Sequence, residues 1–461
     1  MQFLSIYDLI FTPIMLLLIF IVARIYRNRM IVDHPEYKFY LPGLFAKLFG
    51  GIGLILVYTL YYPGGDTVQY YNDAIAIIKL GFYDPASYFK LMTRAHDMSV
   101  YYYFNADTGF PCYYRDSNAF FVAKLSSFIV FFSFKSIVTA TVLVATVSYV
   151  GVWKLFKVFY YEFPQIDKQL AIAVFFIPSV FFWGSGLLKD TYTFSSMGFF
   201  TYSFYMVFIK RKKVLVNIFT LCISSFIIVA IKPYILIGLL PGVLIWLTHN
   251  LLLKIKGSIA RTAALPILLM ITVVFGYILL TMLSAELDDY TLDNILKKAM
   301  VTQQDLKRDY YQGNSFDIGD FDPDIMSMIK KAPLAINAAL FRPFILEANN
   351  LVMFLSSVEN LVVLLLTIKV LVKARVFGFF RIVFKNHLLM FAFIFSIFFA
   401  FSVGISTSNF GSLVRYKIPV IPFYIACLYI VQYKLDQERA LKKSISVQAS
   451  SQVKGLTLAG A

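Results

Sequence analysis

Five short polar clusters interrupt an otherwise apolar chain, and their residue types could together bind an anion and activate a hydroxyl group. They are Gly64-Gly65-Asp66, Lys189-Asp190, Lys232-Pro233, the stretch from Arg342 to Glu347, and Arg415-Tyr416-Lys417. A carboxylate such as Asp66 can act as a general base or hold a metal ion, and glycines before it let a ligand approach the backbone closely. Arginine offers a fork of donors that matches a phosphate, whereas lysine supplies a point charge.

The acidic residues of these clusters also have plain structural interpretations. Asp73 follows Asp66 by seven residues and shares its face if a helix begins near Thr67. Asp66 could instead cap that helix. Lys189 and Asp190 are sequence neighbours that cannot face each other on a helix, so each needs its own partner. Lys189 could alternatively extend to lipid headgroups.

The basic residues favour a polyanion site when they are taken together. Arg342 or Arg415 alone could anchor lipid phosphate, but four basic groups near membrane ends on one face predict a shared ligand. Glu347 and Glu359 could pair with them, and a glutamate inside a span is itself unfavourable. We predict Asp66 as the catalytic base. We predict no cofactor and no set of metal ligands, although the Asp66 carboxylate could hold a divalent ion. The predicted substrate-binding residues are Asp73, Lys189, Asp190, Lys232, Arg342, Glu347, Arg415 and Tyr416.

Composition places these residues in a membrane protein. Of the 461 residues 59% are hydrophobic and only 15% charged, and the mean hydropathy is +0.72. One soluble domain could not bury so much apolar surface. The net charge of +16 comes from short Lys/Arg runs between apolar stretches, which are orientation signals rather than a nucleic-acid site. The three cysteines are far apart and indicate neither a disulfide framework nor a zinc site.

The apolar runs predict an all-α bundle of about eleven transmembrane helices in one integral membrane domain, residues 1–443. The first run, Leu9 to Ala23, is expected to be a retained helix. The positive-inside rule puts the N-terminus outside and the C-terminus in the cytoplasm. Enlarged external loops are expected at about 63–118 and 284–348, and the Ser/Gln-rich tail, 444–461, is expected to be disordered. The basic segments predicted to be cytoplasmic are 24–29, 154–168, 210–213, 254–261 and 373–385.

Several apolar stretches must break to fit a bilayer. Residues 170–209 would form a helix of about 60 Å, twice the thickness of a bilayer core, so the chain should turn back near Gly184-Ser185-Gly186. Lys232-Pro233 should break the stretch 214–249. Residues 119–153 suit one span plus a re-entrant or interfacial piece, and Val68 to Leu80 suits a short amphipathic helix. This topology places all five polar clusters on the external side.

The motifs resemble those of known membrane enzymes. The string from Phe182 to Asp190, the early Gly-Gly-Asp, the stretch Arg342 to Glu347 and the segment Gly411 to Pro422 are similar to membrane glycosyltransferases of the GT-C class and to bacterial O-antigen-type (Wzy-like) polymerases. The resemblance implies a GT-C-like fold in the bacterial cytoplasmic membrane. It also implies a polyprenyl-phosphate-linked glycan as substrate, at the external face, in cell-surface polysaccharide biosynthesis.

Carried over by residue, the resemblance makes Asp66 the base and Lys189 and Arg415 the phosphate clamps, with Arg342 a weaker match. This chain has one acidic residue, not an Asp-Glu pair, at the first-loop position. Two other functions stay open. A transporter or flippase for an anionic lipid-linked glycan would need charges along its whole path, and a non-catalytic subunit of an envelope or secretion assembly would use the external loops for binding.

Overall fold

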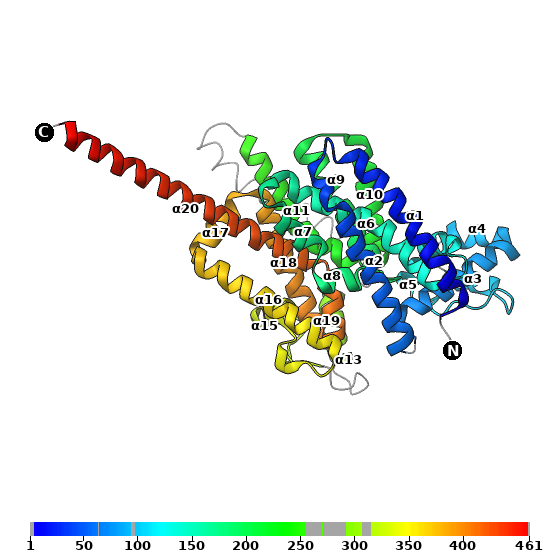
Figure 1. Ribbon diagram of the computed structural model, residues 1–461. Coiled ribbons are helices and arrows are strands. Elements are labelled where there is room, and N and C mark those ends of the chain that lie inside the picture. The colour runs from blue at the N-terminus through cyan, green and yellow to red at the C-terminus, as the bar shows by residue number, and fades with distance from the viewer. Residues whose placement is uncertain are drawn as a thin grey trace.

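The computed structural model describes residues 4–62, 64–93, 97–254, 270, 292–306 and 315–459, and this part of the chain is built from helices and connecting turns (Figure 1). No β-strand occurs among these residues, where the only extended pairing is an isolated bridge between Ser315 and Asn409. The predicted all-α class is confirmed. A helix suits an apolar chain because it satisfies its own backbone groups where the bilayer offers no water.

Six helices of the described chain are long and apolar enough to cross a membrane, which makes this a multi-pass membrane protein. A seventh crossing results if α19 (Phe410–Tyr416) and the start of α20 (Val420–Ala459), bent by 63°, form one span. The predicted number of eleven is not confirmed. The apolar run 262–283, which the sequence predicts as one of these spans, lies outside the described residues apart from Met270. The six are α1 (Ile6–Met30), Pro35–Tyr61 with α2 (Tyr40–Leu56), α6 (Ile137–Glu162), α10 (Val214–Ile231), α16 (Leu351–Ala374) and α18 (His387–Ser406).

The spans differ in how much of their surface the protein covers. In α6, 72% of the most apolar window is buried within the bundle, compared with 17% in α1. Helix α6 is therefore a central element, packed against α2 and α9 (Lys189–Phe204). Leu9 and Leu17 of α1 are exposed, as expected of side chains that face lipid.

The chain breaks its helices at both places that the sequence predicted. The chain turns at Gly184 to Leu188, between α8 (Pro178–Trp183) and α9, after α7 (Asp167–Phe175). The second predicted break separates α10 from α11 (Pro233–Lys254), and a proline opens α8 and α11, where its missing N–H is harmless. The stretch 119–153 contains the span-length α6 and the shorter apolar α5 (Ser117–Val130).

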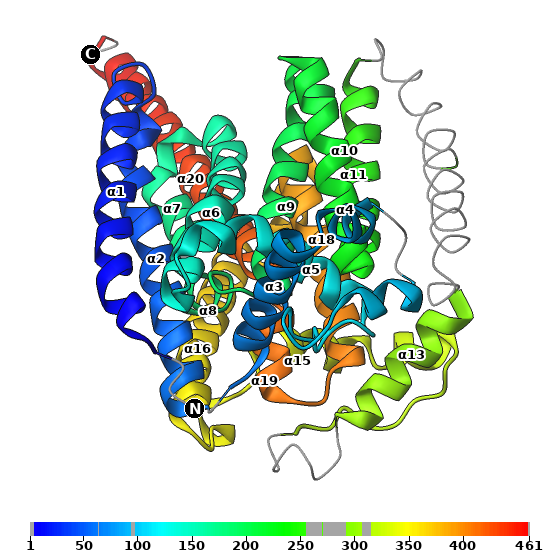
Figure 2. The ribbon, with the colours of Figure 1, turned by 90° about the vertical axis from the view of Figure 1, so that its right-hand side faces the viewer.

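The first enlarged loop folds into helices. The amphipathic helix expected at 68–80 is part of α3 (Asp66–Tyr83), followed by α4 (Pro85–Thr93). The inner face of α3 is buried against α5 through Ile77, Leu80 and Phe120, so the loop forms a cap on the bundle. Figure 2 shows α3, α4 and α5 grouped together on the side of the bundle that faces the viewer.

The second loop and the tail are also largely helical where they are described. The loop contains α13 (Leu292–Asp305), α14 (Ile325–Lys330) and α15 (Ala332–Phe341), and α17 (Val376–Lys385) follows α16. Helix α20 runs to Ala459, through the tail for which the sequence predicted disorder. A stretch without proline can continue a helix whose first turns are anchored in the bundle.

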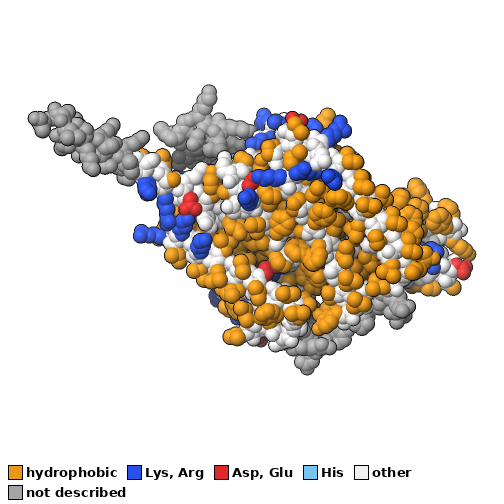
Figure 3. Space-filling model, viewed as in Figure 1, with side chains coloured by type: hydrophobic (Ala, Val, Ile, Leu, Met, Phe, Trp, Pro, Cys, Tyr) orange, Lys and Arg blue, Asp and Glu red, His pale blue; other side chains and the backbone are white. Residues whose placement is uncertain are grey.

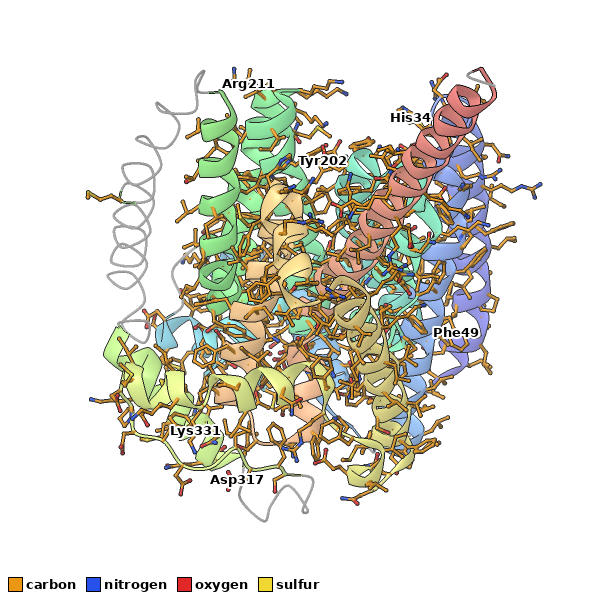
Figure 4. All side chains as sticks on the ribbon, turned by 90° about the vertical axis from the view of Figure 1, so that its left-hand side faces the viewer. His34, Phe49, Tyr202, Arg211, Asp317 and Lys331 are labelled. Carbon is orange, nitrogen blue, oxygen red and sulfur yellow. The ribbon has the colours of Figure 1, made fainter. Side chains whose placement is uncertain are left out.

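The two ends of the bundle carry different segments of the chain. Figure 4 shows His34 and Arg211 near one end and Asp317 and Lys331 near the other. In the view of Figure 3, Lys and Arg side chains gather mainly along the upper and left edges, and hydrophobic side chains cover most of the remaining surface. The segments near 34 and 211, which the sequence assigned to one side, thus lie at one end.

We expect the end that contains Asp317 to face outward. A cysteine at exposed Asp317 should react with a membrane-impermeant thiol reagent added to intact cells, and one at exposed Lys212 should react only after permeabilisation, because Lys/Arg-rich segments stay in the cytoplasm. The background should lack Cys112, Cys222 and Cys427. Labelling of Lys212→Cys in intact cells with protection of Asp317→Cys would invert this orientation.

Candidate functional site

Arg415 of α19 joins two carboxylates from distant parts of the chain. Its Nη2 donates to Asp66 Oδ2 at 2.8 Å and lies 3.5 Å from Asp190 Oδ2. Asp66 begins α3 and Asp190 lies in the first turn of α9. Three of the five polar clusters therefore meet at a single guanidinium.

A fourth cluster joins through Lys232. Its Nζ lies 2.5 Å from Asp190 Oδ1, so Asp190 binds Lys232 with one oxygen and Arg415 with the other. The Lys232 ammonium also sits over the Tyr416 ring, 4.9 Å from its centroid. These contacts bring Asp190, Lys232, Arg415 and Tyr416 together.

Helix N-termini converge on this charged cluster, which we define as Asp66, Asp190, Lys232 and Arg415. α3 begins at Asp66, α9 at Lys189 and α11 at Pro233, beside Lys232. Each N-terminus carries a partial positive charge of roughly half a unit from its unpaired N–H groups. The convergence explains why aspartates occupy two of the first turns, and it makes the region suited to a further anion.

The glycine before Asp66 is required by the geometry. Gly65 has φ +137°, a conformation that L side chains rarely adopt, and a Cβ there would lie 2.4 Å from the Tyr58 ring. Gly65 is the N-cap of α3. Asp66 is thus the first helical residue, and its carboxylate binds other elements instead of acting as the predicted alternative cap.

Tyr113, in the loop before α5, completes the surroundings of Asp66. Its hydroxyl donates to Asp66 Oδ1 at 2.9 Å. Burial and the negative charge of Asp66 raise the pKa of the Tyr113 phenol, so the phenol keeps its proton and remains a donor. Each oxygen of Asp66 therefore has one donor, from Tyr113 or Arg415.

Asp73 supports that loop and does not join the charged cluster through any described contact. Its two oxygens accept the backbone N–H groups of Cys112 at 2.7 Å and Tyr113 at 2.9 Å. Burial raises the pKa of the Asp73 carboxyl, against the lowering effect of these two bonds. Asp66 and Asp73 share one face of α3 as predicted, and Asp73 positions Tyr113.

Lys189 pairs with Asp116, at an N–O distance of 2.9 Å. Asp116 is the N-cap of α5 and also accepts from the backbone of Ala119. Burial alone would raise the pKa of the Asp116 carboxyl, but the bonds from Lys189 and the helix N-terminus lower it overall. The N-terminus of α5 is thereby the fourth at this site, and Lys189 binds a carboxylate in place of the headgroups considered above.

Exposure separates the members of the cluster into two pairs. The side chains of Asp66 and Arg415 are 37% and 23% exposed, whereas those of Asp190 and Lys232 are 2% and 8% exposed. Asp66 and Arg415 can therefore meet a ligand. Asp190 and Lys232 form a buried support, and the two carboxylates balance the two cations.

Arg342 occupies a neighbouring position. Its guanidinium makes a bidentate pair with Glu347 and packs on the rings of Phe316 and Phe410, at 4.9 and 5.5 Å from the centroids. The proposed pairing of Arg342 with Glu347 is confirmed. The described link to the charged cluster runs through Lys417, whose Nζ lies 3.4 Å from the Arg342 carbonyl.

A cavity of about 400 Å³ lies along α9 and α10. It begins at Tyr192, two residues after Asp190, and on α10 at Ile227, five residues before Lys232. Its rim includes Val147 and Phe219, which are exposed on the outside of the bundle. The cavity thus opens toward the lipid.

Two residues of the site are not recognisable from the sequence. Tyr113 is one of many tyrosines in its loop, and Asp116 showed only the pattern of a helix cap before Ser117.

Among the described residues, no three His, Cys, Asp or Glu side chains gather as a metal site would require. No protein-family model, curated protein or solved structure matches the chain significantly.

We expect Asp190 to matter more for stability than Asp66. Asp190→Asn leaves two cations without their buried partner and should lower the free energy of unfolding by about 3–5 kcal/mol. Asp66→Asn, at a more exposed pair, should lower it by about 0–1 kcal/mol. Unfolding of the purified protein in detergent would measure both, and a larger loss for Asp66→Asn would contradict this division.

Proposed function

We propose that this protein is a glycosyltransferase or polysaccharide polymerase of the bacterial cytoplasmic membrane, acting on a polyprenyl-phosphate-linked sugar or oligosaccharide at the external face. The observation that carries the proposal is an accessible carboxylate and guanidinium, Asp66 and Arg415, where four helix N-termini meet. The likeness of the motifs to GT-C enzymes and Wzy-like polymerases suggests the substrate class.

The phosphate of the donor would bind at Arg415 and Lys189. The charged residues balance one another, so the attraction for a further anion comes from the helix N-termini and from donors not yet engaged. Arginine has five N–H donors, and both carboxylates contact Nη2 of Arg415, so Asp66 and Asp190 leave other donors of the guanidinium unused. These donors would stabilise the departing polyprenyl (pyro)phosphate.

Asp66 would be the general base. When the phosphate engages Arg415, Asp66 gives up part of its ion pair while Asp190 still holds the guanidinium from the buried side. Release from the guanidinium frees an oxygen of Asp66 for the acceptor hydroxyl, so Asp66 can take the proton of that hydroxyl. The Tyr113 hydroxyl keeps the carboxylate oriented during this exchange.

The cavity along α9 and α10 would take the hydrocarbon chain of the donor. Hydroxyl groups in the cavity wall, such as those of Thr220 and Ser224, already donate to carbonyls of their own helix. Because these hydroxyls are satisfied within the protein, an apolar chain could enter the cavity without breaking a hydrogen bond. No charged residue lines this described cavity. That composition disfavours the transporter alternative, which needs charges along the path.

Asp66→Asn should abolish most turnover. Asparagine has nearly the same shape but cannot accept the proton at neutral pH, and a positioned base contributes about 10²–10⁴-fold in rate. Transfer of radiolabelled sugar from a polyprenyl donor by membranes would measure it. Asp107→Asn, an exposed residue of the same loop, is the matched control and should keep full activity. Full activity of Asp66→Asn at normal protein levels would show that Asp66 is not the base.

Filling the cavity should weaken binding of long-chain donors. Ile223→Trp places a large ring in the cavity wall and should raise KM for a long-chain donor by roughly tenfold, the scale of hydrophobic pocket discrimination. Leu215→Trp, on the lipid-exposed side of the same helix, is the control. A donor with a truncated chain should be transferred equally by both variants. Equal loss for both donors would indicate that the cavity does not hold the chain.

A further inference from the structure

The short helix α8 leads into the charged cluster but cannot be stable by itself. It has six residues and breaks on both sides, and its last residue, Trp183, has its ring 5.9 Å from the Arg415 guanidinium carbon. The turn that follows delivers Lys189 and Asp190. So short a helix leaves most of its end groups without intrahelical partners, and in an apolar surrounding such groups must be satisfied by other elements.

Glu359 of α16 satisfies the N-terminal end. Its two oxygens accept the backbone N–H of Ser179 at 2.7 Å and the Ser179 hydroxyl at 2.6 Å. The N–H groups of Val180 and Phe181 both donate to the Ile177 carbonyl, and Pro178 has none. Ser179 therefore has the one N–H in the first turn of α8 that lacks this backbone acceptor, and the buried Glu359 accepts it.

Lys47 of α2 satisfies the opposite end. Its buried ammonium donates to the carbonyl of Gly184, the residue that closes α8. Helix α2 approaches α8 closely at Gly50, where a Cβ would lie 2.0 Å from the Phe181 carbonyl oxygen. An acidic side chain thus holds the start of α8 and a basic one holds its end, which is the favourable arrangement for the helix dipole.

The part of α16 that contains Glu359 also binds the segment after Arg415. Lys417, two residues beyond Arg415, donates to Asn360 Oδ1 at 2.5 Å, and Asn360 is the neighbour of Glu359 on α16. Adjacent residues of one helix therefore fix both α8 and the α19–α20 junction. These are the elements that bring Trp183 and Arg415 together.

We propose that Glu359 and Lys47 are positioning residues that fix α8 at its two ends and so hold the turn from Gly184 to Leu188, and with it Lys189 and Asp190, in register with Arg415. The role in catalysis rests on the proposed function, but the effect on the turn does not. Neither side chain touches the charged cluster through a described contact, so each acts through α8.

A buried cysteine in the turn reports its opening independently of activity. Ser185 is fully buried, and its hydroxyl donates to the Phe181 carbonyl at 2.5 Å. Ser396 of α18 is its matched control, since it is equally buried and donates to the Ala392 carbonyl four residues earlier, on a helix remote from the turn. Ser185→Cys and Ser396→Cys would each be made in a background without Cys112, Cys222 and Cys427, and their modification rates by a soluble thiol reagent measured in detergent-solubilised protein.

Glu359→Ala and Lys47→Met should each raise the modification rate of Ser185→Cys by roughly tenfold or more through local opening, and leave that of Ser396→Cys unchanged. Glu359→Gln, which keeps one acceptor oxygen, should give a smaller increase and remains useful if the alanine variant fails to accumulate. Thr367→Val removes another buried hydrogen bond of α16, to Tyr424 at 3.1 Å, and should change neither rate.

Three outcomes would overturn the proposal. The first is an unchanged modification rate of Ser185→Cys in both Glu359→Ala and Lys47→Met. The second is an equal increase in the rates of Ser185→Cys and Ser396→Cys, which means general loosening of the protein. The third is an increase of the Ser185→Cys rate by Thr367→Val as large as that by Glu359→Ala. Sugar transfer measured on the same variants with native serines separates the two proposals. Opening of the turn without loss of transfer leaves the positioning of α8 intact and argues against the proposed role of the charged cluster.

Discussion

Arg415 is bound to two carboxylates that lie 349 and 225 residues away in the sequence, and the arrangement of the site depends on this shared guanidinium. Without a cation between them, Asp66 and Asp190 would place two negative charges close together in a poorly solvated region. Lys232 binds the second oxygen of Asp190 and keeps that side buried. The result is an asymmetric cluster in which the carboxylate of Asp66 is accessible and that of Asp190 is buried.

The bilayer imposes a second constraint, because a helix broken inside it exposes backbone groups that lipid cannot satisfy. This protein breaks its helices near the charged cluster and supplies the missing partners from other helices. Glu359 and Lys47 serve α8, Asp116 serves α5, and Asp73 serves the loop before it. The breaks before α3, α5, α9 and α11 also bring a helix N-terminus to the site, so a feature that costs stability creates the field that an anionic ligand would use.

Charge balance shapes what the site can bind. The ion pairs Lys189–Asp116, Lys232–Asp190 and Arg342–Glu347 neutralise most of the basic residues that suggested a polyanion site. An anion must therefore compete with carboxylates already in place, and the exchange is easiest at the partly exposed pair of Asp66 and Arg415. Under the proposed function, binding of a phosphate to Arg415 would release an oxygen of Asp66, a chemical role that a set of unpaired cations would lack.

The sequence by itself determined the class of the molecule and the positions of its breaks. Apolar runs of known length against a bilayer of fixed thickness predicted a helical membrane protein, and Gly184 to Gly186 and Lys232-Pro233 were identifiable as interruptions because glycine, proline and charge disrupt helices locally. The predicted topology placed Asp66, Asp190, Lys232 and Arg415 on one side of the membrane. Residues at one end of a bundle occupy a limited area, so this placement favours their proximity without specifying their contacts.

Only the tertiary structure decided which charge pairs with which. The local sequence pattern carries no information on partners hundreds of residues apart. For this reason Tyr113, Asp116 and Lys47 could not be distinguished from other loop or span residues. Asp73 was predicted to bind the ligand, and in the structure it supports a loop. A span-length helix is likewise recognisable from its own composition, whereas helices such as α8 and α9 persist through contacts with other elements. Side-chain partners are set by packing between helices, and the amino-acid pattern of a single segment does not contain that packing.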